Sequence, residues 1–570
     1  MRTSRALCLL FIALVVAACA PTAPSSTADG SQAQRPTINR TVVLIARGEI
    51  ASLAAKQLQG TGGGIDQLLV IYNATLDMRD ENGAAIPYLA EALPQLNTDT
   101  WRVFPDGRME TTYRLKPNVT WHDGTPLSAE DFLFAWRVYA TPAFGTTGPP
   151  IGYMEEVLAR DPRTLTIRWR QLYPEAGFAE GTGFRNGFPP LPRHLLEQPF
   201  RDLDPQAFAS HRFWTQDYVG LGPYKVERFE PGAFVEATAF DGFVFGRPKI
   251  DRMRLIFIGD TNTVLANMLA GEGHYVTDFV LGTEEGLTLE RDWASRAPGG
   301  TVYHAPTLMR LSQVQLKPEL VNPPILRDVR IRKALAYAMD NDAALEAITY
   351  GKGRVVVVPI PSDYDYYPAV EREVPRYPFD QNRARQLIEE VGFVRGSDGF
   401  YQSPSGEAFR LEYGFILQAN NERENAIFVD SLRRVGVAAS PRPLTAVELR
   451  DPQARVSFPG LFTSGAANLL DNVRAEIPEP SNRWQGRNRG AWENAEFDRL
   501  KETFDVTLQP SERTRLIVQM SRIFADELPG IPHYLTTVVN AWSGNLGGVT
   551  PKAQPNVIPL SLIHKWEWRQ

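Results

Sequence analysis

The stretch YRLKPNVTWHDGTPLSAEDFLFAWRVY, residues 113–139, constrains the fold more than any other part of this sequence of 570 residues. Residues 111–116 alternate between a face of Thr, Tyr and Leu and a face that carries Arg and Lys. This period of two predicts a strand with one buried face. His122 and Asp123 begin a turn at Gly124, where glycine can take the positive φ that tight turns need. Neighbours in an extended segment point to opposite faces, so we interpret His122 and Asp123 as scaffold and not as a catalytic pair.

A helix is predicted directly after this turn. Ser128 stands at the expected N-cap and Asp131 three residues later, so each side chain can bond to an exposed amide group near the other. The apolar residues that follow have the spacing i, i+3, i+4, i+7 of one helix face: Phe132, Ala135, Trp136 and Tyr139. Strand, turn and helix therefore form one local unit.

This unit resembles the signature of the extracellular solute-binding proteins, family 5, of peptide/nickel-type ABC importers. That family has a strand ending in Trp-x-Asp-Gly, followed by Thr-Pro-Leu-Thr-Ala-x-Asp-Val. The matching residues here are Trp121, Asp123, Gly124, Pro126, Leu127, Ala129 and Asp131. Further matches are GPYKV at 222–226, DVRIRKALAYAMD at 328–340 and PGIP at 529–532, so the resemblance covers about residues 87–532.

The resemblance implies an α/β protein with the two-lobed periplasmic-binding-protein (Venus-flytrap) fold, of the large class with an extra subdomain in the first lobe. A chain of 570 residues is also too long for one hydrophobic core. The first lobe is expected at 37–309, with the extra subdomain at about 76–210. The second lobe is expected at 310–510, and residues 511–570 are expected to return to the first lobe.

The N-terminus has the features of an export signal. Residues 1–18 contain Arg2 and Arg5 and then an apolar run that is short for a transmembrane helix. The run ends in Val-Ala-Ala before Cys19, which looks like the lipobox of bacterial lipoproteins. We expect cleavage before Cys19, lipid attachment to this cysteine and a disordered tether over 19–36. A plain signal peptide with an accidental cysteine is the alternative.

Composition restricts the function further. Hydrophobic content of 43% and charged content of 22% are typical of a soluble globular body, and the net charge of −6 argues against nucleic acid as a partner. The two cysteines, Cys8 and Cys19, both precede the folded body, so no disulfide or cysteine metal site is expected. The seven histidines are scattered without metal-ligand spacing. We find no hydrolase, metalloprotease, Walker or dinucleotide motif, and interpret the glycine cluster at 60–64 as a flexible loop. The sequence therefore predicts no catalytic residues, metal or cofactor.

The candidate ligand site lies in the irregular region after residue 458. Peptide-binding members of the family place an acidic residue in a Trp-x-x-Asp-x-x-Asp-Pro segment that pairs with the α-ammonium of the peptide. The equivalent segment here, FPGLFTSGAANLLDN at 458–472, has lost the Trp and the Asp-Pro and contains no acid before Asp471. Aromatic residues beyond it can cover a ligand and exclude water, although core packing explains each of them equally well. The predicted ligand-binding residues are Asn468, Asp471, Arg474, Trp484, Trp492 and Asn494.

The predicted function is solute capture for import. The chain is expected to be a monomeric, non-enzymatic lipoprotein that closes two lobes over a peptide or peptide-like solute and delivers it to an ABC permease with its ATPase. It would lie on the periplasmic or extracellular face of the membrane. Three alternatives remain open: a ligand-sensing lipoprotein, a binder of an oligosaccharide or metal chelate, and an exported hydrolase with a nucleophile–base pair in its cleft.

Overall fold

The computed structural model describes residues 41–56, 58, 66–146, 148–178, 187–356, 358–445, 447–466, 468–474 and 477–569. The chain divides into two compact units, Met1–Asn39 and Arg40–Gln570, and the following description concerns the second. The predicted signal peptide, Cys19, the tether and the glycine cluster at 60–64 all lie outside the described residues.

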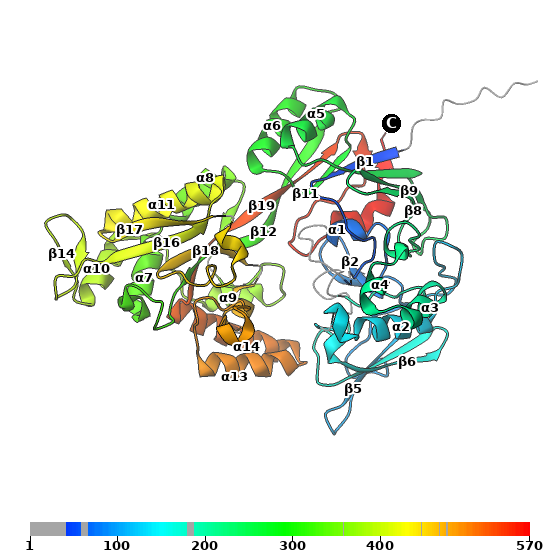
Figure 1. Cartoon of the computed structure of the whole chain (residues 1–570), viewed down its shortest axis with the longest axis horizontal. Helices are drawn as coiled ribbons and strands as arrows, with labels where there is room; N and C mark the ends of the chain where they lie inside the picture. Colours follow the sequence, from blue (N-terminus) through cyan, green and yellow to red (C-terminus); the bar gives the residue numbers. More distant parts are fainter. Residues whose placement is uncertain are drawn as a thin grey trace, which may run out of the picture. The chain divides into compact units, whose positions relative to one another are not determined.

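One mixed sheet of 11 strands forms the centre of the second unit. Its strands are β1 (Thr41–Ala46), β8 (Tyr224–Glu230), β9 (Phe234–Ala239), β10 (Arg252–Phe257), β11 (Tyr275–Leu281), β12 (Gly300–Val314), β13 (Arg354–Val355), β16 (Arg410–Ile416), β17 (Ala438–Leu444), β18 (Leu461–Ala466) and β19 (Gly530–Ser543). The order is β17-β16-β18-β12-β19-β11-β1-β10-β9-β8, with β13 paired to β19 off this path. In Figure 1 the red strand β19 lies between the green strands β12 and β11, so segments far apart in the sequence are neighbours in the sheet.

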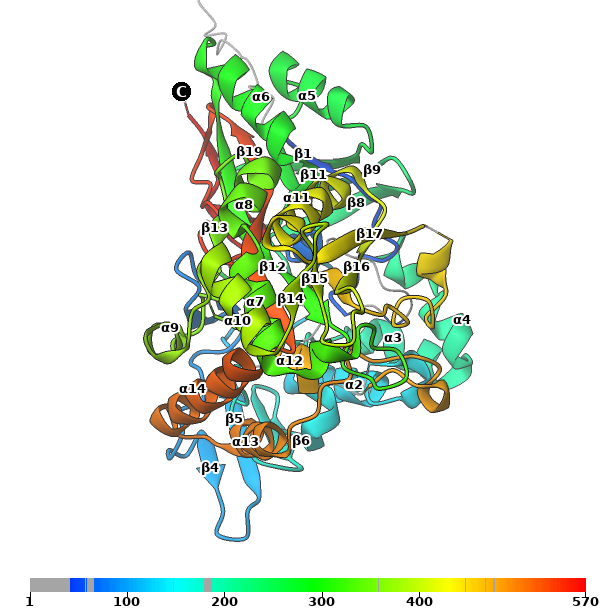
Figure 2. The ribbon, with the colours of Figure 1, turned by 90° about the vertical axis from the view of Figure 1, so that its left-hand side faces the viewer.

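β12 and β19 are the two long strands that connect the lobes, and they lie side by side (Figure 2). They pair antiparallel from Gly300↔Ser543 to Gln313↔Gly530, and the register shifts after Pro306. The half that contains Gly300 joins the first lobe, because β19 there also pairs with β11. The half that contains Gln313 joins the second lobe, because β12 there also pairs with β18. The mixed α/β fold with two lobes is therefore confirmed.

The extra subdomain has its own antiparallel sheet of order β4-β5-β7-β6. Its elements are β4 (Trp101–Val103), β5 (Met109–Arg114), α2 (Ala129–Tyr139), β6 (Met154–Asp161), β7 (Thr164–Trp169), α3 (Arg193–Asp202) and α4 (Pro205–Ala209). Ser128 caps α2 and forms the predicted capping box with Asp131. His122 is buried and bonds to the carbonyl oxygen of Gly222 at 2.9 Å, whereas Asp123 pairs with His194 at 2.7 Å. The two neighbours thus have separate partners, as expected for scaffold residues.

Helices pack on both sides of the sheet around separate hydrophobic clusters. In the first lobe, α5 (Thr261–Ala270) and α6 (Thr283–Ala294) share a cluster with β1, β11 and β19. The helices of the second lobe are α7 (Val329–Ala338), α8 (Asn341–Thr349), α9 (Tyr367–Glu373), α10 (Gln381–Glu390), α11 (Ala419–Val435), α12 (Leu469–Arg474), α13 (Ala495–Val506) and α14 (Pro510–Glu527). Helices α7, α10 and α11 bury one cluster, and α9, α13 and α14 bury another.

The remaining short elements connect these parts. They include α1 (Asp66–Leu69), β2 (Asp77–Arg79), β3 (Ala85–Pro87), β14 (Val394–Arg395), β15 (Tyr401–Gln402), β20 (Leu546–Gly547), β21 (Glu567–Trp568) and several 3-10 helices, of which the longest is Pro559–Lys565.

The position of α14 differs from the expected lobe boundary at 510/511. Pro510 is the first residue of α14 and not the end of the lobe. Leu516, Met520 and Phe524 of this helix pack in one cluster with Leu311 of β12. The packing therefore assigns α14 to the second lobe, and the chain returns to the first lobe along β19.

Candidate functional site

The strand directions identify the part of the fold where a ligand can bind. In the first lobe β1 is parallel to β10 and β11, and β11 runs from Tyr275, opposite Trp542, towards Leu281, opposite Val539. In the second lobe β16 is parallel to β17 and β18, and β18 ends at Ala466, opposite Met309. The parallel strands of both lobes therefore end towards the middle of β12 and β19. Ligands of open α/β sheets bind at the carboxyl ends of such strands.

Apolar side chains are exposed at this position. Phe279 near the end of β11 is 46% exposed, Leu308 on β12 is 41% exposed, and Leu417 directly after β16 is 50% exposed. Phe279 also has φ of +65°, at the irregularity between Val276 and Leu281 where β11 leaves the regular ladder. A bulky side chain rarely adopts this conformation, and such strain concentrates at functional sites. Near its end β11 thus interrupts its regular pairing with β19 and exposes the ring of Phe279.

A buried ion pair lies next to Phe279. Asp278 accepts hydrogen bonds from the Lys552 ammonium at 2.6 Å and from the Asn540 amide at 2.7 Å. The side chains of Asp278 and Lys552 are only 4% and 12% exposed. Because a buried charge needs a close partner, this contact fixes the C-terminal segment against β11 and β19.

Two of the predicted residues, Asn468 and Asp471, lie together after the end of β18. The side-chain oxygen of Asn468 accepts a hydrogen bond from the backbone of Leu470 at 3.0 Å, and so caps the first turn of α12. Asp471 forms an ion pair with Lys501 of α13 at 3.4 Å. Both act on the Tyr364 hydroxyl: burial first, and then the charge of Asp471, raises its pKa, whereas the Asn468 side chain opposes this shift.

Tyr364 and Tyr366 are the aromatic residues that the sequence analysis missed. Their rings stack with centroids 5.0 Å apart and planes 10° apart. Tyr366 also meets Phe504 edge-on at 6.1 Å, and the guanidinium of Arg513 lies 3.9 Å from the centre of the Phe504 ring. The run DYDYY at 363–367, between Pro361 and Pro368, was the available sequence signal.

Residues of the extra subdomain lie close to this aromatic pair. Burial lowers the pKa of the Arg513 guanidinium, and Tyr366 and then Glu175 oppose that shift by their charge. Glu175 also raises the pKa of Tyr364. Glu175 follows β7 in the first lobe and accepts a hydrogen bond from Tyr173 at 3.2 Å. The two tyrosines therefore lie where the lobes approach each other.

The other predicted residues have different surroundings. Trp492 is 5% exposed, and its indole N–H donates to Glu527 at 2.7 Å. Asn494 caps α13 and donates to the other oxygen of Glu527 at 2.6 Å. Trp484 is half-buried, with the Lys317 ammonium 5.9 Å from its ring centre. Arg474 ends α12, and its side chain lies outside the described residues.

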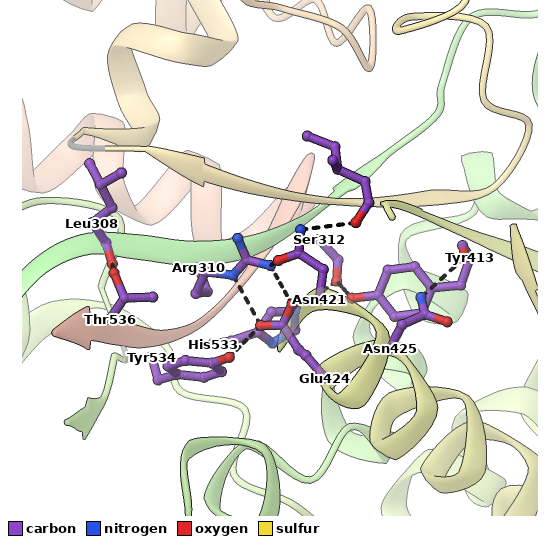
Figure 3. Close-up of polar contacts among 11 residues, drawn as sticks. Leu308, Arg310, Ser312, Tyr413, Asn421, Glu424, Asn425, His533, Tyr534 and Thr536 are labelled. Atoms are coloured by element: carbon purple, nitrogen blue, oxygen red, sulfur yellow. Dashed lines mark hydrogen bonds and ion pairs between the residues drawn. The ribbon is translucent and has the colours of Figure 1, made fainter. Parts of the chain in front are cut away.

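A serine–histidine pair resembles a catalytic arrangement. The Ser312 hydroxyl lies 2.6 Å from Nε2 of His533, and both residues are labelled in Figure 3. Nδ1 of His533 lies 2.7 Å from the side-chain oxygen of Asn341. Both Ser312 and His533 have 0% exposure, and burial lowers the pKa of His533 to about 3. Ser312 also bonds to the Tyr413 hydroxyl. The pair is thus a sealed part of the core, and no substrate carbonyl reaches it in this conformation.

A hollow of about 580 Å³ lies elsewhere, in the extra subdomain, where it is lined by α2 and by the strands β5, β6 and β7. Trp136 and Arg137 of α2 face Glu155 and Arg168 across it. Arg168 already bonds to Glu110 at 2.8 Å and to Glu156 at 2.5 Å. Because all of its lining residues belong to the extra subdomain, we place the candidate site at the strand ends.

Two further searches concern only the described part of the chain. Within it, no group of three or more His, Cys, Asp or Glu side chains is arranged to hold a metal ion. None of the described helices is long and apolar enough to cross a membrane.

The fold and the strand-end site define a two-lobed solute-binding protein. Residues 91–473 match the family described as bacterial extracellular solute-binding proteins, family 5 Middle. The chain belongs to this family.

Several known proteins are similar over nearly the full length. The oligopeptide-binding protein AppA of Bacillus subtilis (strain 168) is 22% identical over 98% of this chain and 97% of its own length. An oligopeptide-binding protein of Thermus thermophilus, solved with a pentapeptide, has a TM-score of 0.68 at 21% identity and covers 93% of this chain and 96% of its own. NikZ of Campylobacter jejuni, solved with Ni(L-His), has a TM-score of 0.69 at 19% identity over 93% of this chain and 100% of its own.

Proposed function

We propose that this protein is the extracytoplasmic substrate-binding component of an ABC importer and that it captures a peptide or peptide-like solute between its two lobes. The observation that carries the proposal is the convergence of strand ends from both lobes on β12 and β19. Phe279, Leu308 and Leu417 are exposed there, and buried apolar area is the main source of affinity for a solute enclosed between lobes. Closure is favoured only by contacts that the solute makes in the closed state.

Lipid attachment at Cys19 completes the proposal. The anchored body would capture solute at the membrane surface and present it to the permease. Replacement of Cys19 by serine should move the protein from the membrane to the soluble fraction, and retention of the C19S variant on membranes would contradict the anchor. We also propose that the protein is a monomer. We further propose that it has no enzymatic activity, since the Ser312–His533 pair is sealed.

A metal chelate is the second candidate solute. The similarity to NikZ, together with the missing acidic segment at 458–472, supports this alternative. A free peptide N-terminus without a partner would be costly in a closed site, whereas a chelate has no such group.

Native mass spectrometry of residues 37–570, purified without added solute, tests the proposal. A ladder of masses that disappears after denaturation would identify peptides, and a single mass with a metal isotope pattern would identify a chelate. The control is the same protein unfolded in urea, dialysed and refolded, which should be empty. If the native protein is empty as well, a thermal-shift panel of peptides and chelates follows, because a bound solute raises the unfolding temperature. No shift with any of them would refute the proposed function.

A further inference from the structure

A buried ion pair lies at the second-lobe side of the candidate site (Figure 3). Arg310 of β12 is held by Glu424 of α11: Nε donates to one carboxylate oxygen at 3.0 Å, and Nη2 donates to the other. The Arg310 side chain is 16% exposed and that of Glu424 only 1%. Bidentate contacts of this kind fix the plane of a guanidinium as well as its position.

The remaining contacts of Arg310 use up one side of its guanidinium. Nη2 also donates to the side-chain oxygen of Asn421 at 3.0 Å, and the Asn421 amide in turn donates to the carbonyl oxygen of Ile416 at 3.0 Å. Glu424 further accepts a hydrogen bond from the Tyr534 hydroxyl, and this bond also stabilises the negative charge of the carboxylate. Arginine has five N–H groups, and the three on Nε and Nη2 are all occupied here.

Two N–H groups on Nη1 are left over. Among the described residues none bonds to Nη1, and this atom is not one of the buried side-chain atoms that lack a hydrogen-bond partner. Figure 3 accordingly draws no dashed line to it. The ion pair with Glu424 explains the charge and the orientation of Arg310 but not this second, accessible edge.

The surroundings of Arg310 belong to the candidate site. Leu308 precedes it by two residues on the same face of β12 and is exposed, and Gly465 opposite it in the ladder has no side chain to cover it. Asn421 lies in the first turn of α11, which begins two residues after the exposed Leu417. A side chain at position 465 would fill the space next to Leu308, whose atoms lie 3.7 Å from where its Cβ would be.

We propose that Arg310 binds a carboxylate of the solute through its two N–H groups on Nη1, with Glu424 and Asn421 as positioning residues. The inference rests on the proposed function and specifies the chemical class of the solute, one with an accessible carboxylate. The C-terminus of a peptide and the carboxylate of a metal chelate share this chemistry. Either would meet an arginine whose orientation is already fixed, so little entropy is lost on binding.

The test uses matched probes with and without a carboxylate. Penta-alanine and Nα-acetyl-penta-alanine are each compared with their C-terminal amide, and Ni(L-His) is compared with Ni(histamine). The full-length protein is solubilised in detergent and stripped of solute, and its affinity for each probe is measured by calorimetry. The variant Arg310→Lys keeps a charge beside Glu424 but loses the planar fork and the Nη1 edge. Arg168→Lys is the matched control, because Arg168 also bonds to two carboxylates but in the extra subdomain.

We expect the wild type and Arg168→Lys to bind carboxylate probes at least tenfold more tightly than their counterparts without a carboxylate. Arg310→Lys should reduce this ratio to twofold or less while its unfolding temperature stays close to that of the wild type. Equal affinity of the wild type for both members of each pair would overturn the inference and leave the proposed function standing. An unchanged ratio in Arg310→Lys would also overturn it. Failure of every probe to bind would overturn the inference and the proposed function together.

Discussion

Replacement of Trp492 tests whether this residue holds the fold or covers a ligand. The sequence alone predicts that the double variant Trp484→Ala, Trp492→Ala binds solute weakly and keeps its fold. In the structure Trp492 is 5% exposed, meets Phe497 edge-on at 5.0 Å and donates to Glu527 at 2.7 Å. Trp484 is half-buried under Lys317. The two single variants should therefore behave differently.

The expected cost can be worked out from these contacts. A buried tryptophan removes roughly 200 Å² from water, worth about 5 kcal/mol as an upper bound, and measured Trp→Ala changes in cores cost about 3–5 kcal/mol. Trp492→Phe should cost about 2 kcal/mol, because it loses chiefly the hydrogen bond to a carboxylate. Glu527 keeps its bond from Asn494 at 2.6 Å in both variants. Trp484→Ala should cost less than about 1 kcal/mol.

Urea unfolding of residues 37–570 at pH 7 measures these differences, with circular dichroism as the signal. We expect the midpoints in the order wild type, Trp484→Ala, Trp492→Phe and Trp492→Ala, from most to least stable. Equal midpoints for Trp492→Ala and Trp484→Ala would refute the reasoning, since a core tryptophan bonded to Glu527 cannot be removed without cost.

Three further predictions concern pH, capping and binding. Burial lowers the pKa of His533 to about 3 from an ordinary value of 6.5, so the unfolded state binds a proton first and stability falls as pH drops below 6.5. The free energy of unfolding should lose about 2 kcal/mol from this group between pH 7 and pH 5, and His533→Asn should flatten that part of a urea-midpoint profile; an unchanged slope would contradict it. Ser128→Ala removes one half of the capping box of α2 and should cost about 1 kcal/mol in thermal unfolding, whereas Ser210→Ala at the C-terminal end of α4 should cost little. Tyr364→Ala should weaken binding of the co-purified solute at least tenfold by calorimetry, with Tyr350→Ala as the control outside the stacked pair, and equal affinities would exclude Tyr364 from the site.

The local sequence pattern was sufficient to predict a helix where capping residues mark its start. The capping pair Ser128 and Asp131 fixed the start of α2, and the spacing of Phe132, Ala135 and Tyr139 identified its buried face. The lobe boundary expected at 510/511 had no such local signal, and Pro510 is the first residue of α14. Whether a helix packs with one lobe or another depends on contacts across the sequence, here with Leu311, and no local pattern contains them.

The site was less accessible to sequence reasoning. Asn468 and Asp471 were chosen from a family segment, and they lie beside Tyr364, but their role as ligand contacts stays a prediction. The sequence analysis did not predict Arg310 as a site residue, because a single arginine in a strand forms no recognisable motif. Its interest arises only because Glu424 and Asn421, more than 100 residues away, occupy three of its five N–H groups.

The pairing of β12 with β19 has a consequence for how such a protein can be rearranged. The chain enters the second lobe along β12 and leaves it along β19, and Met309 and Leu535 are paired residues in that ladder. The second lobe is thus one uninterrupted piece of chain whose two ends are hydrogen-bonded neighbours. A segment of that kind can be exchanged between relatives as a cassette, which would replace Arg310, Tyr364 and Asp471 at once. The first lobe would keep Phe279 and the Asp278–Lys552 ion pair through such an exchange.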